Sequence, residues 1–415
     1  MAKIVIIGGG IIGLSSAYYL SKHNHDITII DKGTIGGGCS EGNMGWICPS
    51  LSDPVPGPGV IGSGIKWMFK KGSPLYLKPT LIPKLAPWLI GFIKNCNVNN
   101  FTKGLNASLD LGLNSIELYE ELLEEGVSFE YHHKGLLMVF KDEKEAKLKY
   151  EKMQKARNIG QPMPLFLNHE QLLQEEPLLN ESVKAGILMP GERHVRPESL
   201  TKGLEKFLKN KGVTIIENER VLGFDVNNGV VKRVHLKNEQ IPTDICLVAA
   251  GVESVGLLKE GFNKKIPMIS GKGYSITIES EEYAFQHALY FGDTRVGLTP
   301  FNNEFRVGGA MDLTGIDKSL NQERLSTIKK SAEDYLRIKL DNEKVKKQWA
   351  GMRPMTTDGL PVLGPIPKVK NAYIAAGHAM MGISMGLSTG KLISQIVEKD
   401  DLDIDITPFS LERFA

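Results

Sequence analysis

The chain has few cysteines and no long apolar run, and each absence excludes a class of protein. Its four cysteines, Cys39, Cys48, Cys96 and Cys246, are scattered, with no CxxC pair and no cysteine and histidine spacing that suits zinc. This usage is typical of free thiols in a reducing compartment. No window reaches the ~18 consecutive apolar residues of a membrane-spanning helix. A strand-like run begins at Lys3 and leaves no room for a signal peptide, so we expect a cytoplasmic protein.

An excess of charge is also missing. The net charge of +2 argues against a nucleic-acid binder, which normally has a strong basic excess. Apolar residues at 41% and charged residues at 24% are typical of a soluble globular protein. The 415 residues suit two domains better than one core.

Acidic residues are absent from one whole segment. Between Pro54 and Leu109 there is no aspartate or glutamate. Lysines and large aromatic residues interleave there instead: Lys66, Trp67, Phe69, Lys70, Lys71, Tyr76, Lys78, Lys84, Trp88, Phe92, Lys94 and Lys103. Two interpretations remain open. The segment 54–109 either makes a peripheral contact with the inner face of the cell membrane, or forms a proline-rich lid or domain contact with solvent-reaching lysines.

The beginning of the chain has the pattern of a strand, a helix and a second strand. Lys3–Ile7 is a short apolar strand, Gly8–Gly13 a glycine turn, Ile11–His23 a helix and Asp26–Ile30 a β-branched strand. So short a crossover predicts two parallel strands in a right-handed unit.

The glycine turn predicts a dinucleotide site. Gly8, Gly10 and Gly13 fit GxGxxG, in which backbone N–H groups and the helix N-terminus approach a pyrophosphate. Asp31 stands where a carboxylate accepts hydrogen bonds from an adenosine ribose. The alternative is an ordinary glycine-rich turn, but here the strand, helix and acid are all in register.

Three further segments favour FAD over NAD. Gly36–Trp46 is a second glycine-rich loop, with Ser40 and Asn43 as polar contacts. Ala375–Gly386 is another strand, glycine and helix junction, suited to place backbone donors at the electron-rich end of a flavin. Thr243–Gly251 is a strand that brings small residues to the same neighbourhood. A nicotinamide enzyme needs only the first glycine turn.

The rest of the chain alternates between helical and strand-rich parts. Helices are predicted at about 107–125, 142–157 and 321–339, and strands over 266–311. The last 75 residues return to a strand, Asn371–Ala376, and a helix through Glu398. Because nucleotide-binding patterns stand at both ends, we predict an α/β fold in which one domain is built from separated segments and a second domain is inserted.

Five motifs together resemble a known family. GGGIIGLSSAYYL, SEGNMGWICPS, GIKWMFKKGSPLYLKP, WAGMRPMTTDGLPVLG and AAGHAMMGISMGLSTGKL are similar to the D-amino acid oxidase superfamily of FAD-dependent oxidoreductases. Within it the likeness is closest to bacterial D-amino acid dehydrogenases of the small-subunit type, with glycine and sarcosine oxidases as cousins. The resemblance implies a discontinuous Rossmann-like FAD-binding domain over 1–88, 193–265 and 341–415. It also implies an inserted α+β substrate domain, with a mainly antiparallel sheet, over 89–192 and 266–340.

The resemblance also implies site residues. The expected cofactor contacts are Gly8, Gly10, Ile11, Ile12, Gly13, Asp31, Lys32, Ser40, Asn43, Met44, Gly45, Trp46, Val221, Ala250, Gly251, Gly351, Gly377, His378, Met381, Gly382 and Ile383. Many relatives have Glu where Asp31 stands, and the shorter acid is still a ribose acceptor. No cysteine falls in or beside the segments of Arg353 or His378, so we expect non-covalent FAD and no metal.

Three residues are the expected catalytic group. Arg353 matches an arginine that binds a substrate carboxylate, for which its planar fork is suited. Tyr274 and His378 are the other candidates. Each has a structural alternative: Arg353 paired with Asp358, Tyr274 packed in a core, and His378 satisfied by backbone.

The expected activity is oxidative deamination of a small amino acid, with a D-amino acid favoured, to a 2-oxo acid and ammonia through an imine. The electron acceptor is a quinone or respiratory partner, or oxygen. The alternatives are oxidation of a secondary or cyclic amino acid such as D-proline, hydroxyproline, sarcosine or glycine, and a non-catalytic flavin-binding subunit of a larger complex. No nucleic-acid partner is expected.

Overall fold

Strands from both ends of the chain meet in one six-stranded sheet. The computed structural model describes residues 1–62, 64, 73–155 and 162–415. Across the sheet the order is β10 (Thr214–Ile216), β2 (Asp26–Ile30), β1 (Lys3–Ile7), β14 (Ile245–Val248), β21 (Ala372–Ala376) and β20 (Val362–Pro365). All pairs are parallel except β20 and β21. This is the Rossmann-like arrangement, with the carboxyl ends of β1, β2 and β14 at one edge.

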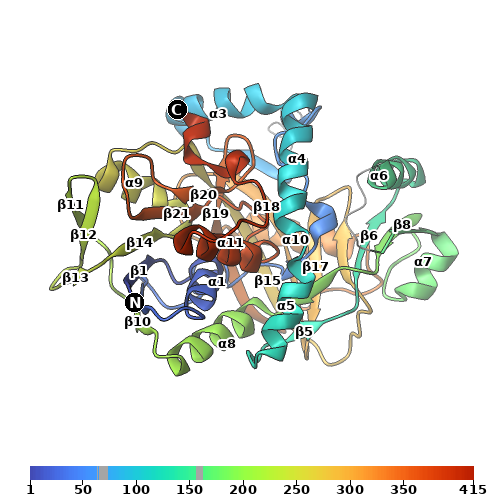
Figure 1. Cartoon of the computed structure of the whole chain (residues 1–415). Helices are drawn as coiled ribbons and strands as arrows, with labels where there is room; N and C mark the ends of the chain where they lie inside the picture. Colours follow the sequence, from blue (N-terminus) through green and yellow to red (C-terminus); the bar gives the residue numbers. More distant parts are fainter. Residues whose placement is uncertain (63, 65–72, 156–161) are drawn as a thin grey trace.

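Alternating apolar residues bury both faces of this sheet. In β1, Ile4 and Ile6 join the cluster formed with α1 (Ile11–Leu20), α8 (Pro197–Asn210) and α11 (Gly386–Glu398). Val5 and Ile7 join the opposite cluster, with α9 (Ser254–Phe262) and an antiparallel sheet. That sheet contains β11 (Gly223–Asn227), β12 (Val230–His235) and β13 (Gln240–Pro242). Figure 1 shows α1 and α11 side by side although they come from opposite ends of the chain.

A nine-stranded sheet forms the second part of the molecule. Its order is β19 (Val345–Thr356), β15 (Met268–Glu279), β18 (Glu304–Leu313), β17 (Val296–Phe301), β16 (Ala288–Phe291), β6 (Leu136–Phe140), β8 (Ala185–Met189) and β7 (Leu165–Asn168), with β4 (Leu75–Leu77) beside β18. Only the β16–β6 and β18–β4 pairs are parallel. Helix α10 (Gln322–Glu333) packs on one face through Leu325 and Ile328.

Shorter elements connect and cover the two parts. A three-stranded sheet contains β3 (Trp46–Ile47), β9 (Arg193–Val195) and β5 (Tyr131–His132). The remaining helices of the described chain are α3 (Ile82–Asn95), α4 (Val98–Gly112), α5 (Ser115–Glu124), α6 (Glu143–Lys155) and α7 (His169–Glu175). The short 3₁₀ helices are η1 (Pro49–Leu51), η2 (Pro79–Leu81), η3 (Gly251–Glu253), η4 (Thr407–Phe409) and η5 (Leu411–Phe414).

The predicted fold class is confirmed, and two predicted helices are wrong in extent. The helix expected over 107–125 is two helices, because the chain leaves helical geometry at Asn114, close to Gly112, and both are weak helix formers. The helix expected to reach 339 ends at Glu333, and Tyr335 turns into the core. The five domain segments remain a proposal. The nine-stranded sheet takes β4 from the first expected segment and β19, which starts at Val345, from the last.

All four cysteines are free thiols. Within the described residues, no helix combines the length and the apolar content that crossing a bilayer requires. In the segment 54–109, for which a membrane contact or a lid is predicted, five of the named residues lie outside the described residues: Lys66, Trp67, Phe69, Lys70 and Lys71.

Candidate active site

The glycine turn lies where the carboxyl ends of β1 and β14 meet the start of α1. Gly8 has a φ of +112°, and a Cβ there would lie 2.4 Å from the Ala249 carbonyl oxygen. A Cβ at Gly13 would lie 1.9 Å from the Gly8 carbonyl oxygen. Helix α1 begins after Gly10, with no side-chain cap and no acid in its first turn. An anion at this end therefore meets the positive end of the helix dipole, and the first helical turn itself carries no acid.

Asp31 ends β2 beside this turn. Its two carboxylate oxygens accept hydrogen bonds from the amides of Gly9, at 2.7 Å, and Gly33, at 2.8 Å. The carboxylate is thereby fixed at the edge of the turn, where the sequence predicts a ribose contact. Val221 is buried in the apolar cluster on the face of the sheet opposite α1. The segment just before Val221 runs beside Asp31, because the Glu219 amide donates to the Asp31 carbonyl.

The loop Ser40–Trp46 connects the glycine turn to the second sheet. The Ile11 amide donates to Ser40 Oγ at 3.0 Å. Asn43 Oδ1 accepts from the Gly45 amide. The side chains of Met44 and Trp46 lie against Gly297 and Gly308, where a Cβ at either position would come within 2.7 Å of one of them. Gly297 of β17 and Gly308 of β18 are paired, and because they lack side chains they leave room for Met44 and Trp46 to pack on the sheet.

The turn Gly377–Ile383 lies against both of these segments. A Cβ at Gly382 would be 3.9 Å from Ile11 Cγ2, and the Cys48 amide donates to Ser384 Oγ at 3.1 Å. The Met381 amide donates to the His378 carbonyl, and the Ile383 carbonyl accepts from the Tyr119 hydroxyl. Segments predicted from distant parts of the sequence are therefore brought together around the N-terminus of α1.

Arg353 lies beside this assembly, on β19. Nη1 donates to the Ala310 carbonyl at 2.7 Å. A Cβ at Gly273 would lie 2.3 Å from Cζ, Nη1 and Nη2 alike, so the guanidinium plane rests face-on against the glycine. Two residues further on, the backbone of Met355 forms an isolated antiparallel β-bridge with His378. The Ala379 amide donates to the Pro354 carbonyl. The arginine therefore stands next to the turn expected to meet the flavin.

No carboxylate pairs with Arg353 among the described residues. Asp358, the predicted structural alternative, is bound to Arg413 at 2.7 Å. Burial lowers the pKa of Arg353, and Cys39 and Asp312 weakly oppose this. Asp312 is already bound by Arg324 and Tyr274. The described residues thus leave a largely desolvated cation whose one hydrogen-bond acceptor is neutral, and such a group favours an anionic ligand.

A β-bulge aims the carbonyl that holds Arg353. Between β15 and β18 the register shifts, so that Ala310 and Met311 together oppose Gly273. Ala310 has a φ of +58°, in the left-handed region that is strained for alanine. Bulges of this kind redirect groups next to functional sites.

Two predicted catalytic residues are not placed as expected. Tyr274 lies on the opposite face of β15 from Arg353, in the core with Ile276, and its hydroxyl donates to Asp312 at 2.9 Å. The ring of His378 points to α11, where Nε2 bonds Thr389 Oγ1 at 2.9 Å. Burial lowers the pKa of His378 to about 3, so the imidazole is neutral. Tyr274 therefore lies in the core, which is its structural alternative, and the His378 ring contacts α11 through Thr389.

Of the other expected cofactor contacts, some lie beside the glycine turn and one is covered by a side chain. Ala250 and Gly251 follow the end of β14, and Ala250 lies next to Gly8. The Lys32 ammonium group pairs with Glu253. The indole of Trp349 covers Gly351 and also Gly42, so Gly351 does not present an open face. Cys39 lies close enough to Arg353 for each to affect the other's pKa, although the two are far apart in the sequence.

Sequence reasoning missed Arg306. This buried side chain donates to the Glu41 and Asn43 carbonyls, at 3.1 and 2.8 Å, and to Thr277 Oγ1. Its remaining nitrogen pairs with Glu198 of α8. It therefore fixes the loop Ser40–Trp46 between the two sheets. The alternation in EFRVGGAMDL places Arg306 on the same side as the small residues, which is the signal that would have found it.

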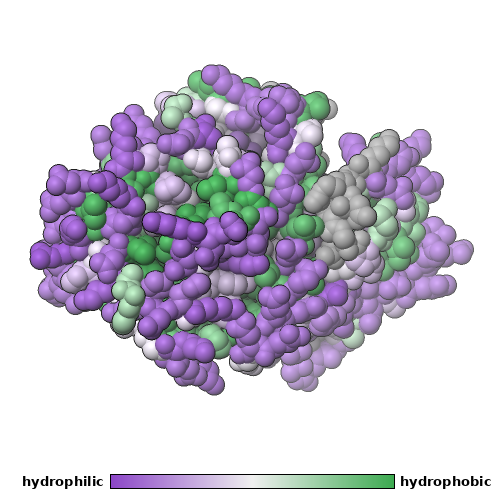
Figure 2. Space-filling view, in the orientation of Figure 1, coloured by the Kyte–Doolittle hydropathy of each residue, from purple (hydrophilic) through white to green (hydrophobic). Residues whose placement is uncertain are grey.

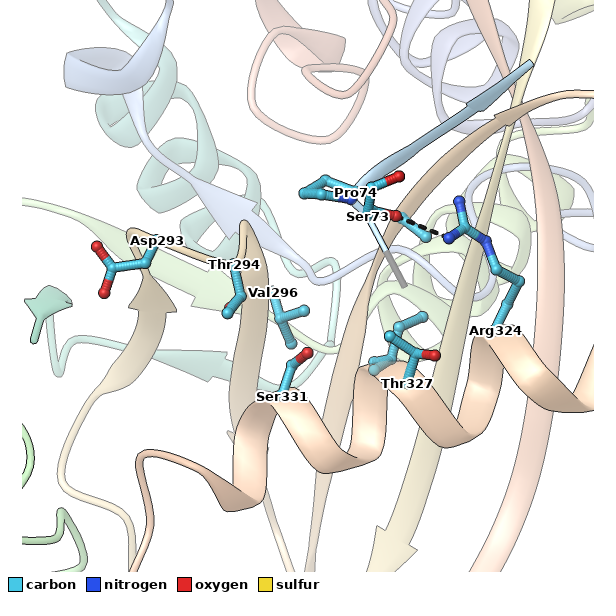
Figure 3. Close-up of a pocket in the computed structure, with 10 residues that line it drawn as sticks. Ser73, Pro74, Asp293, Thr294, Val296, Arg324, Thr327 and Ser331 are labelled. Carbon is cyan, nitrogen blue, oxygen red and sulfur yellow. Dashed lines mark hydrogen bonds between the residues drawn. The ribbon is translucent and has the colours of Figure 1, made fainter. Parts of the chain in front are cut away.

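A small cleft lies behind β18, against α10 (Figure 3). Its volume is about 130 Å³, below the range for a cofactor site. Ala310 lines it, and Arg324 spans it to the Ser73 carbonyl at 2.7 Å. Within the described chain no group of three or more acidic, histidine or cysteine side chains suits a metal ion.

The fold and the glycine junctions define a flavin-binding oxidoreductase. The chain matches the model of the DAO family, described as FAD dependent oxidoreductase, over residues 3–396. It belongs to that family, and FAD is its cofactor.

Known proteins resemble the chain over its whole length. A D-amino acid dehydrogenase from Helicobacter pylori is 29% identical over 411 residues, which are 98% of each chain. The crystal structure of glycine oxidase from Geobacillus kaustophilus superimposes with a TM-score of 0.78, at 23% identity and 99% coverage of both chains. That of L-proline dehydrogenase from P. horikoshii gives 0.77 at 21% identity, covering 100% of this chain and 97% of the other.

Proposed function

We propose that the protein oxidises a small amino acid, with a D-amino acid favoured, to an imine that hydrolyses to the 2-oxo acid and ammonia. The observation that carries this proposal is Arg353, a half-buried cation with a neutral acceptor and no carboxylate partner in the described chain. The dehydrogenase from Helicobacter pylori supports the choice of a D-amino acid.

The residues of the chain bind and orient the substrate. One guanidinium nitrogen of Arg353 donates to the Ala310 carbonyl, and the remaining N–H groups bind the substrate carboxylate. The flat face of the guanidinium group packs against Gly273, which fixes its orientation. Fixing the carboxylate fixes which face of Cα meets the flavin. FAD, held by the glycine turn and the segments beside it, would supply the two-electron acceptor that oxidation of the amine to an imine requires. His378 is neutral and bound to Thr389, so the amine must arrive deprotonated or lose its proton to water.

The same site supports a second candidate reaction. The structural similarity to glycine oxidase and to L-proline dehydrogenase favours oxidation of a glycine-like or cyclic amino acid. D-proline, hydroxyproline and sarcosine are the substrates to compare. A flavin-holding subunit without activity is the alternative outside enzymes.

Anaerobic reduction of the flavin tests these alternatives. We expect D-alanine to bleach the yellow protein and L-alanine not to. Bleaching only by sarcosine, glycine or proline would overturn the D-amino acid proposal in favour of the second candidate. No bleaching by any amino acid would indicate a binding subunit. Reoxidation by a quinone analogue or by oxygen then identifies the acceptor class.

A further inference from the structure

Helix α3 has two apolar stripes, and only one of them is buried. Leu85, Trp88 and Phe92 follow one another at helical spacing and pack inward with Leu313 and Met355. Ile82, Ala86, Ile90 and Ile93 form a second stripe, also at helical spacing, on a different face of the helix. A surface helix normally presents polar residues there.

The outer stripe is open to solvent. Ile82, Ile90 and Ile93 are 44%, 55% and 51% exposed, and Val98, at the start of α4, is 68% exposed. In Figure 1 α3 lies along the upper edge of the molecule, and Figure 2 shows hydrophobic residues interrupting the polar surface there. Several branched apolar side chains gathered on one helix mark an interaction surface.

The charged residues of α3 itself are all basic. Lys84 and Lys94 are exposed on α3, and Lys78 and Lys103 are exposed on the segments that precede and follow it. No acidic residue occurs between Pro54 and Leu109. An apolar stripe with lysines on the same helix complements a surface that is apolar below and anionic above.

The inner stripe ties this surface to the candidate active site. Trp88 Nε1 donates to the Met355 carbonyl at 3.0 Å, two residues from Arg353. A Cβ at Gly91 would come within 2.8 Å of Thr357, so the helix lies close on the strand. Ala379, in the turn expected to meet the flavin, packs against the same cluster. One face of α3 therefore covers the site while the other faces outward.

We propose that the outer face of α3 is a docking surface for an anionic phospholipid bilayer. The isoleucines enter the acyl boundary and the lysines meet the phosphate layer. The bilayer then lies about one helix diameter, ~10 Å, from Met355. Given the proposed oxidation, a lipid-soluble acceptor could reach the flavin from that side. The docking itself requires no substrate.

Vesicle sedimentation of the flavin-loaded protein tests this surface. We expect binding, at low salt, to vesicles of phosphatidylglycerol and phosphatidylcholine in equal parts. Vesicles of phosphatidylcholine alone should bind at least tenfold more weakly, and added salt should release the protein because it screens the lysines. Absence of binding to the anionic vesicles overturns the proposal. Because no substrate is present, that failure leaves the proposed reaction untouched.

Matched variants locate the surface. Ile90→Asp with Ile93→Asp, and separately Lys84→Glu with Lys94→Glu, should each weaken binding at least tenfold. The controls are Leu222→Asp, at a side chain that is 59% exposed elsewhere, and Lys202→Glu with Lys206→Glu on α8. Both should bind as the unmodified protein does.

Two further results would contradict the proposal. Equal binding by the α3 variants and the controls would mean that another surface docks. A dimer in sedimentation velocity that Ile90→Asp with Ile93→Asp dissociates, without vesicle binding, would assign the face to a second copy of the chain. Flavin absorbance and turnover with a soluble dye should be unchanged in every variant, which shows that each has folded.

Discussion

Replacing Gly273 by alanine moves Arg353 without removing it. The added methyl carbon would lie 2.3 Å from Cζ, Nη1 and Nη2, whereas ordinary contact begins at 3.4 Å. The guanidinium group must therefore retreat by about 1 Å. Since it is the far end of a flexible side chain, it can move at little cost to folding. A displacement of ~1 Å at a group that orients the substrate costs on the order of 100-fold in rate.

Stopped-flow reduction of the flavin under anaerobic conditions measures the effect. With a D-amino acid that bleaches the unmodified protein, Gly273→Ala should reduce the flavin about 100-fold more slowly at subsaturating substrate. FAD content and the unfolding midpoint should be unchanged. Gly256→Ala on α9, where an added methyl group meets nothing within 4 Å, is the matched control and should react normally.

A Gly273→Ala protein that reacts at the unmodified rate would refute the reasoning. It would mean either that Arg353 does not bind the substrate or that its resting position on Gly273 is irrelevant to the reaction. Arg353→Met separates these, because it removes the charge altogether.

Four other results are expected. Arg353→Met should weaken substrate binding about 100-fold, or about 3 kcal/mol, and leave FAD bound; unchanged affinity in a titration would exclude Arg353 from the site. Ala310→Gly should raise the free energy of unfolding in urea by up to about 1 kcal/mol, because it relieves a left-handed alanine and keeps the carbonyl; a destabilised variant would contradict the strain. Burial raises the pKa of Glu192 from 4.5 to about 7, so its folded pKa lies above its unfolded value and stability should fall as pH rises through that window. Glu192→Gln should flatten this slope in urea melts, and an unaltered slope would show that other groups cause it. Acid precipitation should release the flavin into the supernatant; flavin in the pellet would indicate covalent attachment, with Cys39 the first residue to test.

Local patterns predict how the segments around the glycine turn are arranged. In Lys3–Ile30 the strand, turn and helix are contiguous, so Gly8, Gly13 and Asp31 meet through chain connectivity alone. The segments at Ser40 and Gly377 are likewise glycine-rich junctions whose position in a Rossmann-like sheet follows from the pattern.

The surroundings of Arg353 depend on long-range packing that no local pattern contains. Tyr274 and Gly273 are neighbours, and which of them faces Arg353 is decided by the side of β15 on which α10 packs. The bulge at Ala310 arises from the pairing of two strands, and the left-handed position is an alanine, so no glycine in the sequence indicates it. Arg306 contacts the loop Ser40–Trp46 across a sequence separation of more than 260 residues.

The order of strands in the six-stranded sheet has a consequence for synthesis of the protein. β1 pairs with β2 and β14, but β14 also needs β21, which begins only at Ala372, and α1 packs on α11. A chain still being translated can complete the glycine turn early, yet it lacks the turn at Gly377 until nearly the whole sequence has been made. Such long-range pairing slows folding. We therefore expect the apoprotein to acquire its cofactor after translation, and newly made chains to compete for free flavin as nearly finished molecules.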